Sequence, residues 1–292
     1  MHKAKQFFFA GIISDKRGEL LMNQRKSLKE LNLLDKFLFD EAMDDPENVK
    51  TMLDIILSQN TNLKHPPQTE KEQRTSTDNR QIRLDVYAID EDDVIYEVEA
   101  QKENTHNLPK RSRLYQGIID SKLLPPGVVD FNLLNEVLIV LIMPFDLFGY
   151  GLYRYTFQMK CEEVPELKLD DGATRIFLNT RGKHPELVSP ELIELLKYME
   201  HSTDEISEAC ESKRIQEMHR RVCQIKASEK AEVKYMQTWE EKILIKQKGE
   251  RIGLERINRL NQKLIEQGRF DDLTKATSDS SYQEKLLKEF KI

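Results

Sequence analysis

Hydrophobic and polar positions follow two different periods along the first half of the chain. In residues 46–58, apolar residues recur every three or four positions behind an aspartate-proline pair, and this spacing predicts a helix. A second helical pattern covers Leu31–Phe39. By contrast, Ile82–Ile89 and Val94–Gln101 alternate with period two on either side of an acidic turn, which predicts a β-hairpin.

The segments after the hairpin continue this mixture of helices and strands. Pro109–Leu123 predicts a basic helix, and the continuous apolar run Glu136–Met143 predicts a strand buried on both faces. Two shorter strands are predicted at Tyr153–Lys160 and Arg175–Leu178. This order of elements indicates an α/β core with a mixed central sheet flanked by helices.

Two other segments have a different character. Residues 60–80 are polar and aperiodic, so we expect a long mobile loop there. The apolar run Phe7–Ile13 is too short to span a bilayer, and no small-residue cleavage site follows it. We therefore expect a strand and a turn at this position, and neither a signal peptide nor a membrane span.

Charge-rich helical patterns dominate the last third of the chain. One predicted helical stretch runs from about residue 202 to Gly249, and further helices are predicted at about 252–268 and 282–290. We therefore expect a domain of residues 1–200 and a helical C-terminal extension of residues 201–292.

The composition and net charge of the chain limit the classes of molecule that it is expected to bind. The chain is 39% hydrophobic and 33% charged with a net charge of −6, so it is no general binder of polyanions. Residues 211–270 nevertheless hold 15 Lys and Arg against 9 Asp and Glu, a local excess of six positive charges. The three cysteines lie far apart and form no Cys-x-x-Cys pair, so we expect a reducing cytosol and neither a disulfide framework nor a zinc site.

The predicted hairpin brings acidic residues together. If its turn is centred on Asp92, then Asp85 and Glu99 are directly opposed, with their Cβ atoms about 4.5–5.5 Å apart. Opposed carboxylates repel each other unless a positive charge lies between them, and hard oxygen ligands suit Mg²⁺ or Mn²⁺. Gln101 points to the same side and could orient an attacking water. Glu97 shares this face and could support the site as a further acid, but we expect it to be an exposed strand residue.

Such a site suits metal-assisted hydrolysis of a phosphodiester. Acidic residues are also common on solvated hairpin faces, and a slip of one residue in the register would turn every side chain to the other face. Spacing alone therefore leaves catalysis and a solvated acidic surface both open.

The stretch RLDVYAIDEDDVIYEVEAQ (Arg83–Gln101) resembles the D…E-x-Q signature of the PD-(D/E)XK nuclease superfamily, in its transposase-related recombination-promoting nuclease (Rpn) group. Residues 31–57 are similar to the N-terminal helices of that group. Residues 108–127 resemble its Arg- and Tyr-containing helix, and residues 131–157 resemble the strands that follow. The C-terminal KLLKEF motif is similar as well, so the resemblance covers nearly the whole chain.

The resemblance implies a restriction-endonuclease-like core and roles for particular residues. Asp85 and Glu99 would be metal ligands, Asp35 would assist metal binding, and Gln101 stands where most of the superfamily has lysine. Because glutamine carries no charge, it could orient water or phosphate but supply no proton. Residues of the basic helix could contact DNA phosphates or could form only a solvated face; they are Lys110, Arg111, Arg113, Tyr115 and Gln116.

The sequence thus predicts a Mg²⁺- or Mn²⁺-dependent DNA endonuclease of the bacterial cytoplasm, linked by resemblance to recombination or transposition. The alternative is a catalytically weak or inactive relative that binds DNA or protein, and a defence nuclease would share the same chemistry. A homodimer is a hypothesis motivated by the long charged helices and by the need to cut both strands of DNA.

Five basic residues of the C-terminal region could contact the DNA backbone without recognising its sequence: Lys213, Arg214, Arg220, Arg221 and Lys226.

Overall fold

The computed structural model describes residues 25–73 and 82–292, and its contacts divide the chain into two compact units, Met1–Ala231 and Glu232–Ile292. The strand expected at Phe7–Ile13 lies outside the described residues. Over the described parts of the chain, no helix is both long and apolar enough to cross a membrane.

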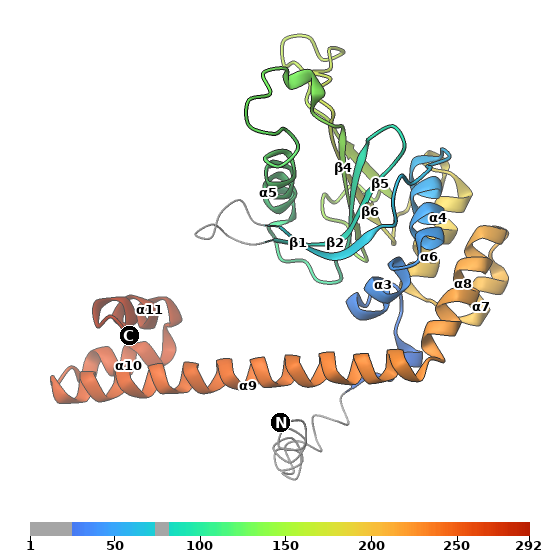
Figure 1. Cartoon of the computed structure of the whole chain (residues 1–292). Coiled ribbons are helices and arrows are strands. Elements are labelled where there is room, and N and C mark those ends of the chain that lie inside the picture. The colour runs from blue at the N-terminus through green and yellow to red at the C-terminus, as the bar shows by residue number, and fades with distance from the viewer. Residues whose placement is uncertain (1–24, 74–81) are drawn as a thin grey trace. The chain divides into compact units, whose positions relative to one another are not determined.

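A six-stranded mixed sheet forms the centre of the first unit, as the α/β prediction required (Figure 1). Its order is β1-β2-β3-β4-β6-β5; β3, β4 and β6 run parallel, and the other neighbours are antiparallel. The strands are β1 (Gln68–Gln73), β2 (Ile82–Ile89), β3 (Ile95–Ala100), β4 (Val137–Met143), β5 (Arg154–Phe157) and β6 (Ala173–Asn179). The continuous apolar sequence of β4 follows from its place between two parallel neighbours, with both faces covered.

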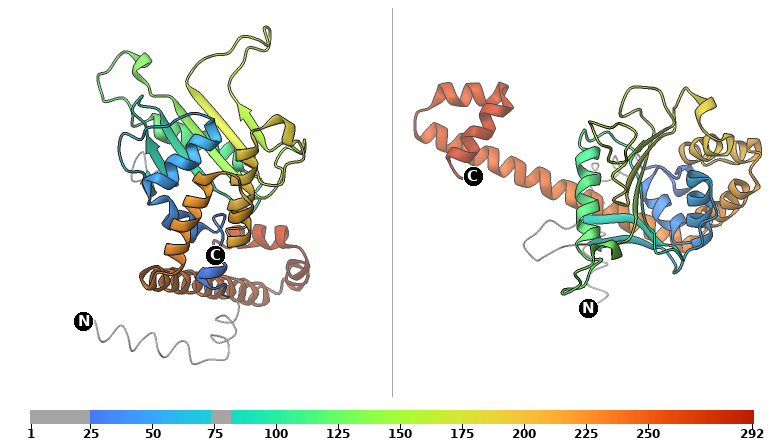
Figure 2. Two further views of the ribbon diagram at one scale, coloured as in Figure 1. Left: turned by 90° about the vertical axis from the view of Figure 1, so that its right-hand side faces the viewer. Right: turned by 90° about the horizontal axis from the view of Figure 1, so that it is seen from above.

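Helices cover both faces of this sheet. Helix α5 packs on one face, and the remaining α-helices of the first unit gather on the other (Figures 1 and 2). These are α3 (Lys36–Met43), α4 (Pro46–Leu57), α5 (Leu108–Asp120), α6 (Pro190–Glu200), α7 (Asp204–Ala209) and α8 (Lys213–Lys226), with short 3₁₀ turns at Leu28–Glu30, Phe131–Leu133 and Pro185–Leu187.

Local sequence explains where α4 begins. The Asp45 side chain accepts a hydrogen bond of 2.9 Å from the backbone N–H of Glu47, and Pro46 occupies the first turn. A cap of this kind stabilises a helix by about 1 kcal/mol. The predicted helix at 46–58 is therefore confirmed.

The polar segment 60–80 is only partly the loop that we expected. Residues Gln68–Gln73 form β1, an edge strand that pairs antiparallel with β2. Edge strands are exposed and commonly polar, so β1 lacks the apolar alternation that marks a half-buried strand. Residues 74–81 lie outside the described residues.

The second unit is entirely helical in its described residues. Helix α9 (Glu229–Glu266) leads into it, and α10 (Phe270–Ser278) and α11 (Ser280–Glu289) complete it. Its small apolar core contains Leu260, Leu264, Ala276 and Leu286. The interruption predicted near Gly249 is wrong, because a glycine costs a helix only about 1 kcal/mol and a long helix tolerates it.

The compact units divide about thirty residues beyond the predicted boundary near residue 200. Helices α7 and α8 belong to the first unit because α8 buries an apolar stripe there. Ile215, Met218 and Val222 are each fully buried, and α8 packs against α3, α4, α6 and α7.

Candidate functional site

The hairpin register matches the prediction. Val86 is opposite Val98, and Ile89 is opposite Ile95, so the turn is centred on Asp92. Continuing this register by one residue sets Asp85 of β2 opposite Glu99 of β3. Both side chains are buried, at 6% and 7% exposure.

Glu97 of β3 is the main correction to the expected site. It is fully buried, whereas we expected an exposed strand residue. It shares its strand parity with Ile95, which packs in the apolar core between the sheet and α5. An isolated hairpin would expose this face, but α5 covers it, so Glu97 joins Asp85 and Glu99 in a buried acidic group.

A lysine from α3 holds one side of this group. The Nζ atom of Lys36 lies 2.5 Å from Asp85 Oδ1, 3.1 Å from Asp40 Oδ2 and 3.8 Å from Glu70 Oε1. Glu70 lies on β1, and continuing the β1–β2 register places it opposite Asp85. Lys36 therefore serves several carboxylates at once, so it cannot fully neutralise them.

An arginine from α5 holds the other side. The guanidinium of Arg111 donates a short hydrogen bond to Glu99 and one of 2.6 Å to Gln101 Oε1. The Gln101 side chain in turn donates to the carbonyl of Glu103 at 2.5 Å. Gln101 therefore lies beside Glu99, as predicted. Its amide oxygen is held by Arg111 and its amide nitrogen by the Glu103 carbonyl.

Several polar atoms in this group have no hydrogen-bond partner. Both carboxylate oxygens of Glu97 and Oε2 of Glu99 are buried and unpartnered, as are Arg111 Nε and Gln116 Oε1 on α5. Buried polar atoms are almost always hydrogen-bonded, so such a concentration indicates bound water, a bound ion or a proton. These atoms form the strongest sign of a ligand site at the hairpin.

The acids are strongly perturbed by their surroundings. Burial raises the pKa of Glu97 well above its ordinary range, and the neighbouring Glu99 adds to this rise. Burial also raises the pKa of Glu99 to about 7 despite the opposing charge of Arg111. The pKa of Asp40 rises to about 7 through burial, against the effect of Lys36. Burial raises the pKa of Asp85 as well, although Lys36 opposes it.

The residues present fit a divalent cation. Three buried carboxyl groups, those of Asp85, Glu97 and Glu99, and the partly buried carboxyl group of Asp40 face two cationic side chains, Lys36 and Arg111. Further positive charge would stabilise the ionised acids. Asp85 and Glu99 would hold such an ion, and their all-oxygen donor set suits Mg²⁺ or Mn²⁺.

Asp35, which was expected to assist metal binding, makes its contacts away from the hairpin acids. It occupies the N-cap position of α3 and not the interior of the expected helix. Its Oδ2 accepts a hydrogen bond of 2.9 Å from the backbone N–H of Asn32, and its Oδ1 pairs with Lys102. These contacts engage both carboxylate oxygens of Asp35, and no contact joins it to Asp85 or Glu99.

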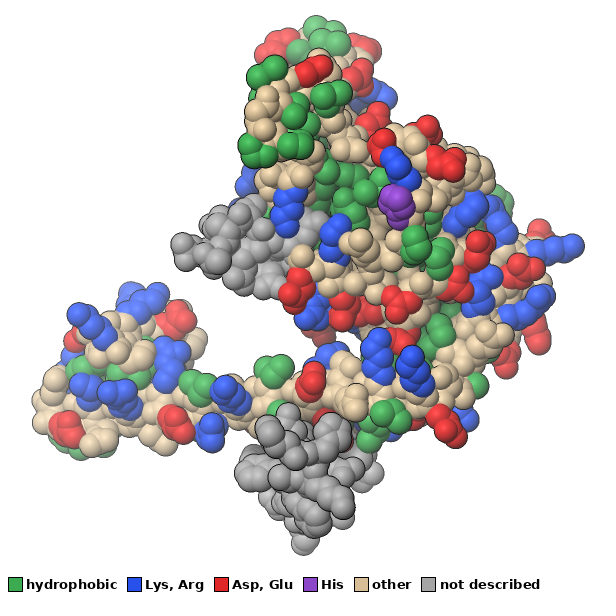
Figure 3. All heavy atoms as spheres, in the orientation of Figure 1, with side chains coloured by type: hydrophobic (Ala, Val, Ile, Leu, Met, Phe, Trp, Pro, Cys, Tyr) green, Lys and Arg blue, Asp and Glu red, His purple; other side chains and the backbone are tan. Residues whose placement is uncertain are grey.

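The five DNA-contact candidates on α5 divide between two faces of the helix. Arg111 reaches Glu99 and the buried Tyr115 lies near Glu97 and Glu99, so these two line the acidic group, whereas the buried Gln116 donates to Asp120. Lys110 and Arg113 are exposed on the other side. In the face shown in Figure 3, basic and acidic side chains are interspersed over this unit, without a broad basic surface on its described residues.

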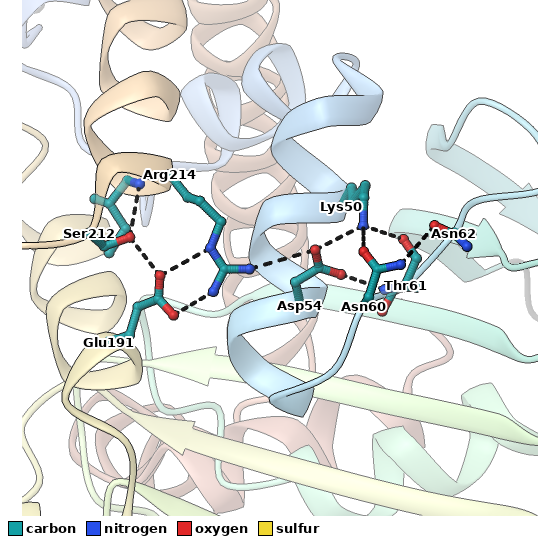
Figure 4. Close-up of polar contacts among 9 residues, drawn as sticks. Lys50, Asp54, Asn60, Thr61, Asn62, Glu191, Ser212 and Arg214 are labelled. Carbon is teal, nitrogen blue, oxygen red and sulfur yellow. Dashed lines mark hydrogen bonds and ion pairs between the residues drawn. The ribbon is translucent and has the colours of Figure 1, made fainter.

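The basic residues of α8 are largely engaged within the protein. Arg214 donates to both oxygens of Glu191 and lies 3.7 Å from Asp54, which also pairs with Lys50 (Figure 4). Several of these side chains line a polar pocket of about 480 Å³. Arg221 binds Asn48 and Lys226 binds a backbone carbonyl, while Lys213 and Arg220 are exposed. This network links α4, α6 and α8 and leaves few of the five cations free for DNA.

Sequence reasoning missed Lys36, Asp40 and Glu70. The sequence pattern could have indicated Lys36 and Asp40, because a lysine and an aspartate four residues apart lie on the same face of a helix. Glu70 had none, because its strand was not recognised. No protein-family model, curated protein or solved structure matches this chain, so the resemblance to the Rpn group stays a prediction from the motifs.

Proposed function

We propose that the chain is a metal-dependent DNA endonuclease with a PD-(D/E)XK-type core. The observation that carries the proposal is the buried pair Asp85 and Glu99, opposed on neighbouring strands beside the unpartnered oxygens of Glu97. A mixed sheet flanked by helices is the architecture that the sequence resemblance implies. Its link to recombination or transposition rests on that resemblance alone.

The site residues would divide the work of phosphodiester hydrolysis. A divalent cation held by Asp85 and Glu99 would supply Lewis acidity and a more acidic water. Gln101 is fixed by Arg111 and the Glu103 carbonyl, so its amide could orient a water or a phosphate oxygen. Lys36 is partly exposed and lies against Asp85, and it brings the positive charge that Gln101 lacks.

A second candidate is a binding module without nuclease activity. It is favoured by the ion pairs of Lys36 with Asp85 and of Arg111 with Glu99, which give each acid a cation belonging to the protein itself. In this case the acidic group would stabilise the fold with no metal, and its remaining acids would stay protonated. Metal binding distinguishes the two candidates.

Cleavage of supercoiled plasmid in Mg²⁺ or Mn²⁺ tests the proposal. We expect the wild type to nick or linearise the plasmid, and Asp85→Asn and Glu99→Gln to lose this activity, because each removes a carboxylate ligand. EDTA should abolish cleavage. Glu91→Gln is the matched control, since Glu91 is an exposed acid in the turn of the same hairpin. Equal cleavage by the ligand variants, or none by the wild type together with no Mn²⁺ binding in calorimetry, would favour the binding module.

DNA binding through the exposed side of α5 makes a separate prediction. Replacing Lys110 and Arg113 by methionine should weaken binding of a duplex in Ca²⁺ buffer similarly for unrelated sequences. It should also reduce the slope of log affinity against log salt by about one for each phosphate that is no longer neutralised. Fluorescence anisotropy at several salt concentrations measures both. Exposed Lys213 and Arg220, replaced likewise, test whether α8 contributes, and an unchanged slope in both pairs would place DNA elsewhere.

A further inference from the structure

Three side chains of metal-binding types converge where the first residue of α7 meets the second half of α8, apart from the hairpin acids. Asp204 is the first residue of α7, and His219 and Cys223 lie one turn apart on α8. His219 Nε2 lies 2.8 Å from Asp204 Oδ1 and 3.3 Å from Cys223 Sγ, and the sulfur lies 3.8 Å from the same oxygen. Within the described ranges, this is the one group of three His, Cys or acidic residues whose donor atoms all lie within 4.8 Å.

We propose that Asp204, His219 and Cys223 form a binding site for a zinc-like transition-metal ion. Imidazole nitrogen, thiolate sulfur and carboxylate oxygen are the three donor types that Zn²⁺ takes in proteins. The cysteine sulfur makes the site unsuited to Mg²⁺ or Ca²⁺, which prefer oxygen. The site is therefore chemically distinct from the hairpin acids. The proposal departs from the expectation of no zinc site, and it rests on the placement of His219 four residues before Cys223 on one helix.

The spacing of the donor atoms agrees with this assignment. Zinc–ligand distances of roughly 2.0–2.3 Å in a tetrahedral arrangement set neighbouring donors about 3.4–3.6 Å apart. The His219–Cys223 and Cys223–Asp204 separations lie within a few tenths of an ångström of that range. The Asp204–His219 contact would have to lengthen by about 0.6 Å, and the Asp204 side chain is 85% exposed and has room to move.

The surroundings orient the histidine for metal binding. Its other ring nitrogen, Nδ1, lies 3.0 Å from the hydroxyl of the buried Tyr198. A hydrogen bond of this kind fixes the ring of a metal-binding histidine and leaves Nε2 for the metal. Lys226 interacts electrostatically with Cys223 and Asp204, and it donates to the Ser202 carbonyl at 2.7 Å, which anchors it beside the site.

A catalytic Cys-His-Asp triad is the obvious rival, and the geometry disfavours it. In a triad, the cysteine and the acid contact different nitrogens of the histidine. Here Asp204 lies against Nε2, the Cys223 sulfur is closer to Nε2 (3.3 Å) than to Nδ1 (3.9 Å), and Nδ1 faces the Tyr198 hydroxyl, so the acid and the cysteine do not contact opposite nitrogens.

A bound ion would connect α7 to α8. Helix α7 has only six residues, and Asp204 lies in its first turn, so a bond from this side chain would anchor the start of α7. Three protein ligands leave a fourth position, which faces solvent beside the exposed Asp204 and suits a water molecule.

Cobalt titration of the EDTA-treated full-length protein tests the site. We expect a near-ultraviolet cobalt–thiolate absorption band whose amplitude corresponds to one Co²⁺ per chain at this site, whatever Co²⁺ the hairpin acids bind, and we expect Zn²⁺ to abolish the band by displacement. Cys223→Ser should remove the band, whereas Cys161→Ser and Cys210→Ser should keep it, since these cysteines lie outside the site. A wild type without the band, or a band that survives in Cys223→Ser, would overturn the proposal.

A second variant guards against misfolding. Asp204 is exposed, so Asp204→Asn should leave the circular dichroism spectrum unchanged while weakening Zn²⁺ binding at least about tenfold in a chelator competition. Unchanged Zn²⁺ affinity in this variant would exclude Asp204 as a ligand and overturn the three-residue site. Plasmid cleavage is not needed for either readout, so the outcome is independent of the proposed nuclease activity.

Discussion

Replacing Arg111 by methionine is expected to lower the free energy of unfolding of the sheet-containing unit by about 3–5 kcal/mol at pH 8, because it leaves the buried Glu99 carboxylate without its partner. Methionine keeps much of the apolar stem of arginine and so isolates the loss of charge. The single tryptophan, Trp239, lies in the second unit. Urea unfolding is therefore best followed through the methyl NMR signals of β4.

The size of this loss should depend on Glu99. In a Glu99→Gln background the same arginine replacement should be much less destabilising, since no carboxylate is left uncompensated. Arg113→Met is the matched control, because Arg113 is exposed two residues further along α5 and should change stability by no more than about 0.5 kcal/mol. An equal loss for Arg111→Met with and without Glu99 would contradict the assigned pairing.

The metal-free protein is expected to be less stable at pH 8 than at pH 5. The pKa values of Asp40 and Glu99 rise to about 7 on folding. Between about pH 4 and 7 the folded protein therefore binds more protons than the unfolded chain, and the free energy of unfolding falls as the pH rises. Each group accounts for a fall on the order of 3 kcal/mol, an upper value because the two lie in one cluster.

This pH dependence can be measured in EDTA by urea unfolding at pH 5 and pH 8. Acids with lowered pKa values, such as Glu191 and Glu200, affect stability only at lower pH and do not obscure the window. Glu99→Gln should remove a large part of the fall, and Glu91→Gln should leave it unchanged. Saturating Mg²⁺ should raise stability at pH 8. A flat profile in the wild type would show that the buried acids are compensated without metal.

The hairpin is the part of the candidate site that could be predicted from sequence patterns. Period-two alternation around an acidic turn predicted β2, β3 and their register, and hence the opposition of Asp85 and Glu99. These features are local, since strand parity and turn length determine which residues of a hairpin face each other. The apolar stripe of α4 and the apolar run of β4 were equally readable.

Other features of the candidate site depend on distant segments. Glu97 looks like an exposed strand residue until α5 covers its face, and only packing brings Lys36 to Asp85 across 49 residues of sequence. Arg111 likewise looked like a DNA contact but lies against Glu99. The polar strand β1 offered no apolar pattern to recognise.

By itself, the sequence determined the α/β class, the main strands and helices, and the two opposed acids, because these follow from side-chain periodicity over ten or fewer residues. Only the tertiary structure decided which of the acids are buried, which cations compensate them, and that Asp204 meets His219 and Cys223. The physical reason is that burial and charge pairing depend on which surfaces pack together. The sequence of a single strand or helix does not specify which distant segments will pack against it.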